Sequence, residues 1–405
     1  MDVFFARQAI FDQSLSVWGY ELLFRSGDTH RADHVNGSFA TAHVLANTLL
    51  SSGGGDLLNG KPALVNFDER LLLDRVGIGL PADKVVIEIL ETVAATPEVL
   101  AACREYKNLG YRLALDDFVF QPGFEPLIEL ADIIKIDFQA TSLQEQAAVL
   151  KKLKSNGRLL LAEKVETQEE FEWGRKSGYN LFQGYFFARP VIVKKNAIPS
   201  SRLSAIAILK ELQQEDLDFL AMEKHIRHDV GLSYRLLSYV NSAKFATVSQ
   251  GCSITSIGRA LLLLGESELR RWMTIIAMSN LGRNKPDELV SQALIRARLM
   301  ESLAKEIGRL DPSEAFLAGM FSLLDALLDR PLPDILREMR VERLLAIYGE
   351  DAVEPMAKVF QLVHCYERAD WHRTDPLTRE LSLEPSRVGD LYTEALGWVA
   401  RSLRA

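Results

Sequence analysis

The first half of the chain alternates short apolar runs with helical patterns, and this alternation limits the folds open to it. The apolar runs predict strands at residues 4–10, 17–25, 63–67, 85–90, 112–118, 133–137, 158–165 and 181–187. Helical spacing is found at residues 36–51, 69–76, 97–109, 143–155 and 168–177. The short polar link between the first two strands favours an antiparallel hairpin, and the later alternation favours a mostly parallel sheet. Eight strands within about 190 residues fit a closed α/β barrel better than an open sheet.

Polar side chains stand at or near the C-terminal end of nearly every predicted strand. These residues are Glu21, Asn66, Glu88, Asp116, Asp117, Lys135, Glu163 and Gln183. An adjacent pair of Asp residues is, by itself, typical of a solvated turn. Their recurrence strand after strand instead predicts one functional mouth, because these ends converge on one face of a barrel. An oxygen-rich cluster suits a hard cation such as Mg²⁺ or Mn²⁺ rather than Zn²⁺.

The overall composition limits the partners and the cellular compartment that we expect for this chain. A chain of 405 residues favours two domains. Its net charge of -8 gives no electrostatic reason to expect a nucleic acid polymer or an anionic membrane as the main partner. No window approaches the ~18 apolar residues of a spanning helix, and the charged start does not resemble a secretory signal. The three widely spaced cysteines, Cys103, Cys252 and Cys365, favour reduced thiols in a cytoplasmic protein.

The motifs at the strand ends resemble those of the EAL domain, a family that cleaves the bacterial second messenger cyclic di-GMP. Glu21-Leu22-Leu23-Phe24-Arg25 resembles the signature Glu-Ala-Leu-x-Arg. Six further segments resemble family motifs in the same order: 65–66, 88–91, 116–118, 135–137, 162–167 and 183–186 with Pro190. The resemblance implies a TIM-like (β/α)8 barrel with an antiparallel first strand, and we expect it to occupy residues 1–194.

The resemblance also implies roles for individual residues around two Mg²⁺ or Mn²⁺ ions per barrel. Metal ligands would be Glu21, Asn66, Glu88, Asp116, Asp117 and Glu163, with Asp116 bridging the two ions. Lys135 would position the nucleophilic water, Glu163 would take its proton, and Glu21 would be essential for turnover. Arg25 and Gln183 would contact cyclic di-GMP, and Glu91 would steady the loop after Asp117. The implied product is linear pGpG.

Three positions depart from the family pattern. The loop Val119-Phe120-Gln121-Pro122-Gly123-Phe124 stands where the family has Gly-Thr-Gly-Tyr-Ser, a loop that couples the metal site to dimerisation and substrate. Lys164 replaces a Gly, and Leu90 replaces a Thr. Two functions therefore stay open. One is a phosphodiesterase, for which the family also implies a homodimer. The other is a weakly active or inactive module that binds cyclic di-GMP or metal and signals to a protein partner.

The second half of the chain shows helical periods only and predicts an all-α domain at residues 204–405, after a polar linker at 195–203. We expect helices at 204–214, 217–228, 234–241, 254–264, 269–281, 287–307, 312–328, 331–337, 341–348, 352–365 and 386–401. Segments 229–243 and 254–270 resemble the HDOD domain, a relative of the HD phosphohydrolases.

The metal ligands of those hydrolases are not found at the corresponding place. Ser322-Leu323 stands where His-Asp is expected, and these side chains cannot hold a dinuclear metal site. His228-Asp229 mimics the missing motif but opens another helix, and His364 beside Cys365 favours helix packing over a zinc site. We therefore expect a non-catalytic platform that contacts a protein partner or the barrel itself.

Overall fold

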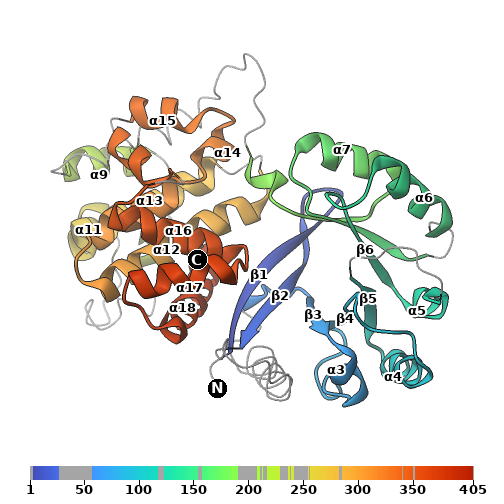
Figure 1. Ribbon diagram of the computed structural model, residues 1–405. Coiled ribbons are helices and arrows are strands. Elements are labelled where there is room, and N and C mark those ends of the chain that lie inside the picture. The colour runs from blue at the N-terminus through green and yellow to red at the C-terminus, as the bar shows by residue number, and fades with distance from the viewer. Residues whose placement is uncertain are drawn as a thin grey trace.

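The computed structural model describes residues 3–26, 57–116, 123–153 and 157–189 of the first half. In the second half it describes residues 217–228, 256–281, 285–339, 341–349 and 352–404, with a few single positions between 208 and 254. The predicted helix at 36–51, the linker, and much of the predicted helices at 204–214 and 234–241 fall outside the described residues. Figure 1 shows the strands on one side of the molecule and a group of helices on the other.

The strands close into an eight-stranded barrel in sequence order, as predicted. The first strand is antiparallel to both of its neighbours, and the other neighbouring strands are parallel. The strands are β1 (Val3–Asp12), β2 (Val17–Ser26), β3 (Ala63–Phe67), β4 (Val85–Ile89), β5 (Arg112–Leu115), β6 (Ile133–Asp137), β7 (Leu159–Glu163) and β8 (Leu181–Gln183). This topology confirms the α/β barrel with an antiparallel first strand.

Short helices follow the parallel strands on the outside of the barrel. They are α3 (Glu69–Leu73), α4 (Pro97–Asn108), α5 (Glu125–Leu130), α6 (Leu143–Leu153), α7 (Gln168–Ser177) and the 3-10 turn η2 (Phe186–Ala188). Thr167 and Glu170 form a capping box that starts α7, and Gly178 ends it in the left-handed region. The prediction of a strand through residue 187 was wrong, because the chain turns at Gly184 and continues as η2.

Helices make up the described regular structure of the second half, which confirms the all-α prediction. They are α9 (Phe219–His228), α11 (Ile257–Leu281), α12 (Asp287–Ile307), α13 (Pro312–Phe321), α14 (Leu324–Leu328), α15 (Leu332–Glu338), η5 (Glu342–Ile347), α16 (Pro355–Glu367), α17 (Trp371–Glu380) and α18 (Pro385–Arg404). Two predicted helices are joined as α11, with non-helical backbone at Gly265 between them. Most residues of α12 are buried, so this helix is the centre of the helical half.

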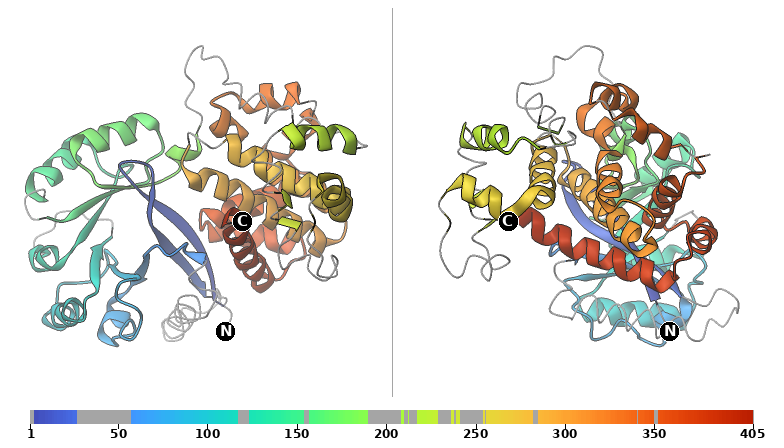
Figure 2. Two further views of the ribbon diagram at one scale, coloured as in Figure 1. Left: turned by 180° about the vertical axis from the view of Figure 1, so that it is seen from behind. Right: turned by 90° about the vertical axis from the view of Figure 1, so that its left-hand side faces the viewer.

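The two halves share one core across the β1–β2 hairpin. Helices α16 and α18 pack against β1, and buried apolar side chains of both halves form one continuous cluster. The Phe5 and Tyr392 rings form a T-shaped pair at a centroid distance of 6.3 Å, and the Tyr366 hydroxyl donates to the Phe5 carbonyl at 3.3 Å. Seen from behind, the hairpin again lies between the barrel and the helices (Figure 2).

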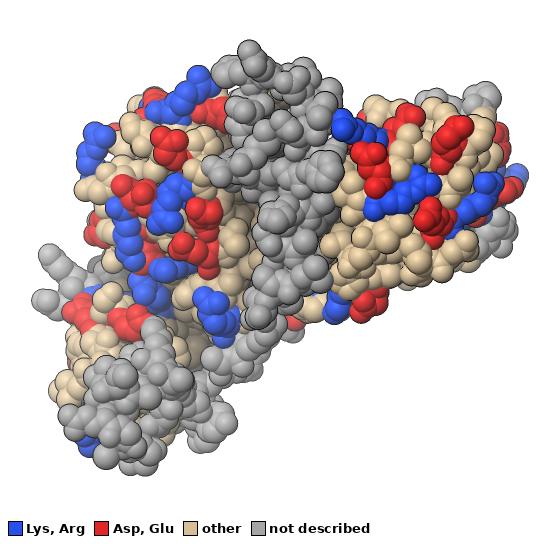
Figure 3. Space-filling view, turned by 90° about the horizontal axis from the view of Figure 1, so that it is seen from below, with Lys and Arg blue, Asp and Glu red and all other residues tan. Residues whose placement is uncertain are grey.

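The described surface mixes charges of both signs. On the face shown in Figure 3, acidic and basic side chains are interspersed over both halves rather than gathered by sign. None of the described helices is both long enough and apolar enough to cross a membrane.

Candidate functional site

On the parallel strands, the residues at the mouth of the barrel lie two positions after the residues of an apolar inner layer. An inner layer of apolar side chains fills the barrel: Ile10, Leu64, Val86, Ala114, Ile133, Leu161 and Leu181. Alternate residues of a strand face the same side, so the residue two positions further along each parallel strand points to the same interior. Those residues are Asn66, Glu88, Asp116, Lys135, Glu163 and Gln183. The sequence therefore places a polar layer directly above an apolar one.

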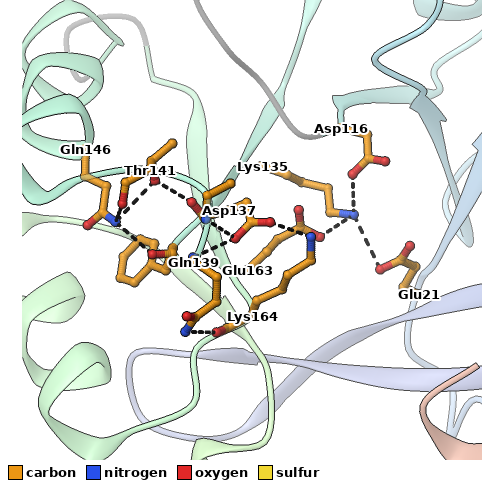
Figure 4. A network of polar contacts seen from close by, with 11 residues as sticks. Glu21, Asp116, Lys135, Asp137, Gln139, Thr141, Gln146, Glu163 and Lys164 are labelled. Atoms are coloured by element: carbon orange, nitrogen blue, oxygen red, sulfur yellow. Dashed lines mark hydrogen bonds and ion pairs between the residues drawn. The ribbon is translucent and has the colours of Figure 1, made fainter. Parts of the chain in front are cut away.

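Lys135 lies at the centre of this polar layer (Figure 4). Its Nζ is 2.6 Å from Glu163 Oε1, 2.9 Å from Asp116 Oδ1 and 3.4 Å from Glu21 Oε2, and it also pairs with Glu88. Lys135 and Glu88 are almost completely buried. Four carboxylates thus surround one ammonium group, and the cluster carries more negative than positive charge when all of these groups are ionised.

Two amides complete the ring of predicted residues. Gln183 Nε2 donates to Glu21 Oε2 at 2.6 Å, and Asn66 Nδ2 donates to Glu21 Oε1 at 3.4 Å. Three buried acceptors of the site have no hydrogen-bond partner among the described residues: Asn66 Oδ1, Glu88 Oε2 and Gln183 Oε1. Buried acceptors without a donor are costly, so these atoms are suited to a cation or a ligand.

Three of the carboxylates lie close enough together to take part in one metal centre. Ligand atoms of Glu21, Glu88 and Glu163 lie within 4.8 Å of one another, and in the described part of the chain these three residues form the one such group. Their oxygen donors match the preference of Mg²⁺ and Mn²⁺. The residues present therefore fit a hard divalent cation.

Burial shifts the protonation of the cluster. Burial, partly offset by Lys135, raises the pKa of Glu163 to about 8. Burial and the neighbouring Glu21 raise the pKa of Glu88 well above its usual range. Burial opposes the charge of Lys135, but Glu163 and the other carboxylates outweigh it and raise the Lys135 pKa. All three pKa values are raised because the site is buried and holds an excess of carboxylates. A bound divalent cation would offset this negative charge.

Gly184 holds Gln183 in this ring through a close backbone contact. Its φ of 146° is a conformation that favours glycine, and a Cβ at this position would collide with the backbone of Val165. In return, Val165 N donates to Gln183 O at 3.0 Å, and Phe186 N donates to Val165 O at 3.2 Å. The glycine of the Gln-Gly-Tyr motif is therefore required where the chain leaves β8 and passes against Val165.

Gln8 belongs to the site but was missed from the sequence. Its Oε1 accepts from Gln183 Nε2 at 2.9 Å, and it is paired with Glu21 across β1 and β2. Because β1 runs in the opposite direction, its residue at the mouth comes two positions before Ile10 of the apolar layer rather than two positions after it. A search for polar residues at C-terminal strand ends cannot find it, whereas a search by barrel layer can.

Asp137 and Lys164 form a second polar cluster beside the first (Figure 4). Asp137 accepts from the backbone N–H groups of Gln139 at 2.6 Å and Ala140 at 3.0 Å, and it pairs with the Lys164 ammonium. Burial opposes these contacts, but together they lower the pKa of Asp137. Lys164 adopts φ 53°, in the left-handed region that favours glycine, and it stands where the family has a glycine. Its side chain adds a cation at the rim of the mouth.

Some predicted site residues are not placed. Asp117 and residues 118–122 of the altered loop lie outside the described residues, as does the side chain of Arg25. Glu91 follows β4 in a turn and is exposed. Gly123, near the end of the loop, has φ 97°, and its N–H donates to Glu125 Oε2 at 2.9 Å as α5 begins. The proposed support of the loop by Glu91 stays a prediction.

The expected HD position of the helical half is filled by an ion pair. Arg296 Nε donates to Glu367 Oε2 at 2.8 Å, and its Nη1 donates to Ser322 Oγ at 3.0 Å. Leu323 is buried, and the His364 ring stacks on Phe360. His228-Asp229 lies outside the residues whose side chains are described. The Arg296 guanidinium therefore lies beside Ser322, at the position where the sequence predicted that this chain lacks a metal ligand.

Family models match both halves of the chain. The EAL domain matches residues 66–190, and the HDOD domain matches residues 198–341. The Glu21 motif precedes the matched EAL segment, yet β2 brings Glu21 into the same ring. A closed barrel with this ring of carboxylates, followed by a helical half, defines a protein with EAL and HDOD domains.

Two relatives are similar over nearly their whole length. YuxH of Bacillus subtilis (strain 168) is 35% identical over 98% of both chains. The cyclic di-GMP phosphodiesterase CdgJ of Vibrio cholerae is 32% identical over 97% of this chain and 91% of its own. The chain therefore belongs to the family of EAL-domain proteins, and it is similar to both relatives along nearly its whole length.

Solved structures match the barrel half. The manganese and cyclic di-GMP complex of Klebsiella pneumoniae BlrP1 is 26% identical over 46% of this chain and 55% of its own, with a TM-score of 0.34. The cyclic di-GMP complex of a standalone EAL protein from Vibrio cholerae O395 is 23% identical over 46% and 92% of the two chains, with a TM-score of 0.35. The barrel assignment comes from the strand order above rather than from these scores.

Proposed function

We propose that this chain is a metal-dependent phosphodiesterase that hydrolyses cyclic di-GMP to linear pGpG. The observation that carries the proposal is the buried ring of Glu21, Glu88, Asp116 and Glu163 around Lys135 at the mouth of the barrel. The name of CdgJ, a relative over nearly the whole chain, supports the same substrate. We place the catalytic domain at 1–194, the linker at 195–203 and the helical domain at 204–405, in the cytoplasm.

The ligands for two Mg²⁺ or Mn²⁺ ions would come from the polar layer. Glu21, Asn66, Glu88 and Asp116 would hold one ion, and Asp116, Asp117 and Glu163 would hold the other. The unpartnered oxygens of Asn66 and Glu88 support this assignment. When bound, such ions lower the pKa of water and neutralise charge that develops on a phosphodiester.

The remaining residues would bind the substrate and handle the proton. Lys135, released from part of its ion pairing, would orient the attacking water. Glu163 would accept the proton of that water. Gln183 and Arg25 would contact the nucleotide, and Gln183 has a buried oxygen without a partner among the described residues. We propose that the helical domain docks a protein partner and that two copies of the chain pair through the barrels.

The test measures binding and turnover on the same protein. Purified protein is incubated with cyclic di-GMP and Mg²⁺ or Mn²⁺, linear pGpG is quantified by chromatography, and binding is measured by calorimetry. We expect turnover in the wild type and in the exposed control Glu129→Gln on α5, and none in Glu21→Ala. Binding without turnover in the wild type would instead identify a binding module, and normal turnover in Glu21→Ala would reject the site.

A further inference from the structure

The β1–β2 hairpin presents one face to the metal site and the other to the helical half. Gln8 and Glu21, which are paired across the hairpin, point into the barrel and contact Gln183. Their chain neighbours Arg7 and Tyr20 point outward and contact α12 instead. This division follows from the alternation of side chains along a strand. A single peptide unit therefore separates an interface residue, Tyr20, from a proposed metal ligand, Glu21.

Glu288 in the first turn of α12 holds both outward residues. Its Oε2 accepts from the Tyr20 hydroxyl at 3.1 Å, and its Oε1 lies 3.7 Å from Arg7 Nη2. The Arg7 guanidinium also lies over the Tyr20 ring, 4.3 Å from the centroid. All three side chains are at least nine-tenths buried. The contact is therefore shielded from solvent and fixed in geometry, unlike a surface ion pair.

Further contacts fix the outward-facing side of β1 in place. The Arg7 backbone N–H donates to the Tyr392 hydroxyl of α18 at 3.4 Å, and the Arg7 side chain donates to the Leu57 carbonyl. A cavity of about 50 Å³ lies beside these contacts and is lined by Gln8 from the barrel and Gln292 from the helical half. Gln8 is thus in reach of both the Gln183–Glu21 pair and the interface.

We infer that Glu288 of the helical half is a positioning residue for the metal ligand Glu21, acting through Tyr20. The inference rests on the proposed function, because it assumes that Glu21 binds metal. The barrel then depends on the helical half for the position of one ligand, and α12 becomes part of the outer shell of the site. Outer-shell partners that orient ligands typically change metal affinity by about 10- to 100-fold when they are removed.

The experiment uses the full chain and measures Mn²⁺ affinity by calorimetry. We expect Glu288→Ala and Tyr20→Phe each to weaken binding about tenfold, and the double variant to lose no more than the stronger single variant. Glu288→Gln keeps an acceptor for Tyr20 and should lose less than Glu288→Ala. Glu306→Gln is the matched control, since Glu306 lies on the same helix and pairs with Arg387 at the surface, and it should bind as the wild type does.

A second measurement separates the inference from the proposed function. Amide hydrogen exchange of the hairpin around Glu21, without metal, should be faster in Glu288→Ala and Tyr20→Phe than in the wild type. If wild-type protein bound no Mn²⁺, the proposed function would fail, and hydrogen exchange would still test the link. Wild-type affinity in a folded Tyr20→Phe variant, or unchanged exchange around Glu21, would overturn the inference.

Discussion

Lys135 is the residue around which the chemistry of the barrel mouth is arranged. Its ammonium lies among four carboxylates, and buried like charges are tolerated only when an opposite charge lies between them. Among the described residues that contact these carboxylates, Lys135 supplies that charge. A divalent cation would compete for the same oxygens and free Lys135 to contact water or phosphate, so one cluster could serve both stability and the proposed catalysis.

Gly184 gives a steric test of the site. Gly184→Ala would drive a methyl group into the Val165 backbone, so we expect a loss of unfolding free energy of about 3 kcal/mol or more and no turnover. The measurement is urea denaturation followed by circular dichroism. Gly157→Ala is the control: Gly157 also has positive φ, at 72°, but nothing lies near its Cβ position. It should cost only about 1 kcal/mol, and an equal loss in both variants would contradict the steric account.

His364 gives a test of pH dependence. Burial lowers the pKa of His364 to about 3, whereas an unfolded chain has a histidine pKa of about 6.5. The unfolded state therefore binds the extra proton first, and stability is lost as pH falls below about 6.5. From about pH 7.5 to about pH 5.5 we expect the wild type to lose about 1 kcal/mol more than His364→Phe, which keeps a ring against Phe360. Equal losses in the two proteins, by denaturation at both pH values, would argue against a buried neutral histidine.

At the scale of elements, well-capped segments were predicted closely and weakly patterned ones were not. Helix α7 begins at its Thr167 capping box and ends at Gly178, as the sequence signals indicate. The six-residue α5 has no side-chain cap, and the strongly polar α17 has Pro376 inside it, a residue that normally ends a helix, so neither helix was predicted. The segment 341–348 is helical but forms a 3-10 turn, η5, which a 3.6-residue period cannot distinguish.

The residues of the candidate site could be predicted from the sequence only in part. Parallel strand ends meet at one face, so Glu88, Lys135 and Glu163 could be grouped from their positions alone. Gln8 was missed because β1 is reversed, and the contact of Glu288 with Tyr20 was missed because it depends on how two domains pack. Strand direction and domain packing are long-range properties that local patterns do not encode.

Gly319 tests the packing of the central helices. Helices α12 and α13 approach so closely that a Cβ on Gly319 would lie 2.6 Å from Ala297 N. Gly319→Ala should therefore separate the helices and lower the unfolding free energy by about 2 kcal/mol, within the usual 1–3 kcal/mol range for overpacking. Denaturant unfolding measures the loss. A stabilised variant, as expected for an open helical position, would contradict the close crossing.

At the scale of the whole molecule, the shared core predicts that both halves unfold together. Buried side chains form one cluster through the barrel and the helices, and α16 and α18 cover β1. We expect one thermal transition in calorimetry, and Mn²⁺ at a hundredfold excess over Kd should stabilise it by ~2.7 kcal/mol. Two transitions, of which Mn²⁺ raised only one, would show that the halves unfold independently.

We propose that the carboxylate ring at the mouth of the barrel forms a metal-dependent phosphodiesterase site. The most direct measurement is the initial rate at which the full chain forms linear pGpG from cyclic di-GMP as Mn²⁺ is titrated. We expect a rate that rises with Mn²⁺ to saturation, falls to background after chelation with EDTA, and stays at background in Glu88→Gln. Absence of linear product at saturating Mn²⁺ and saturating cyclic di-GMP, or an unchanged rate in Glu88→Gln, would contradict it.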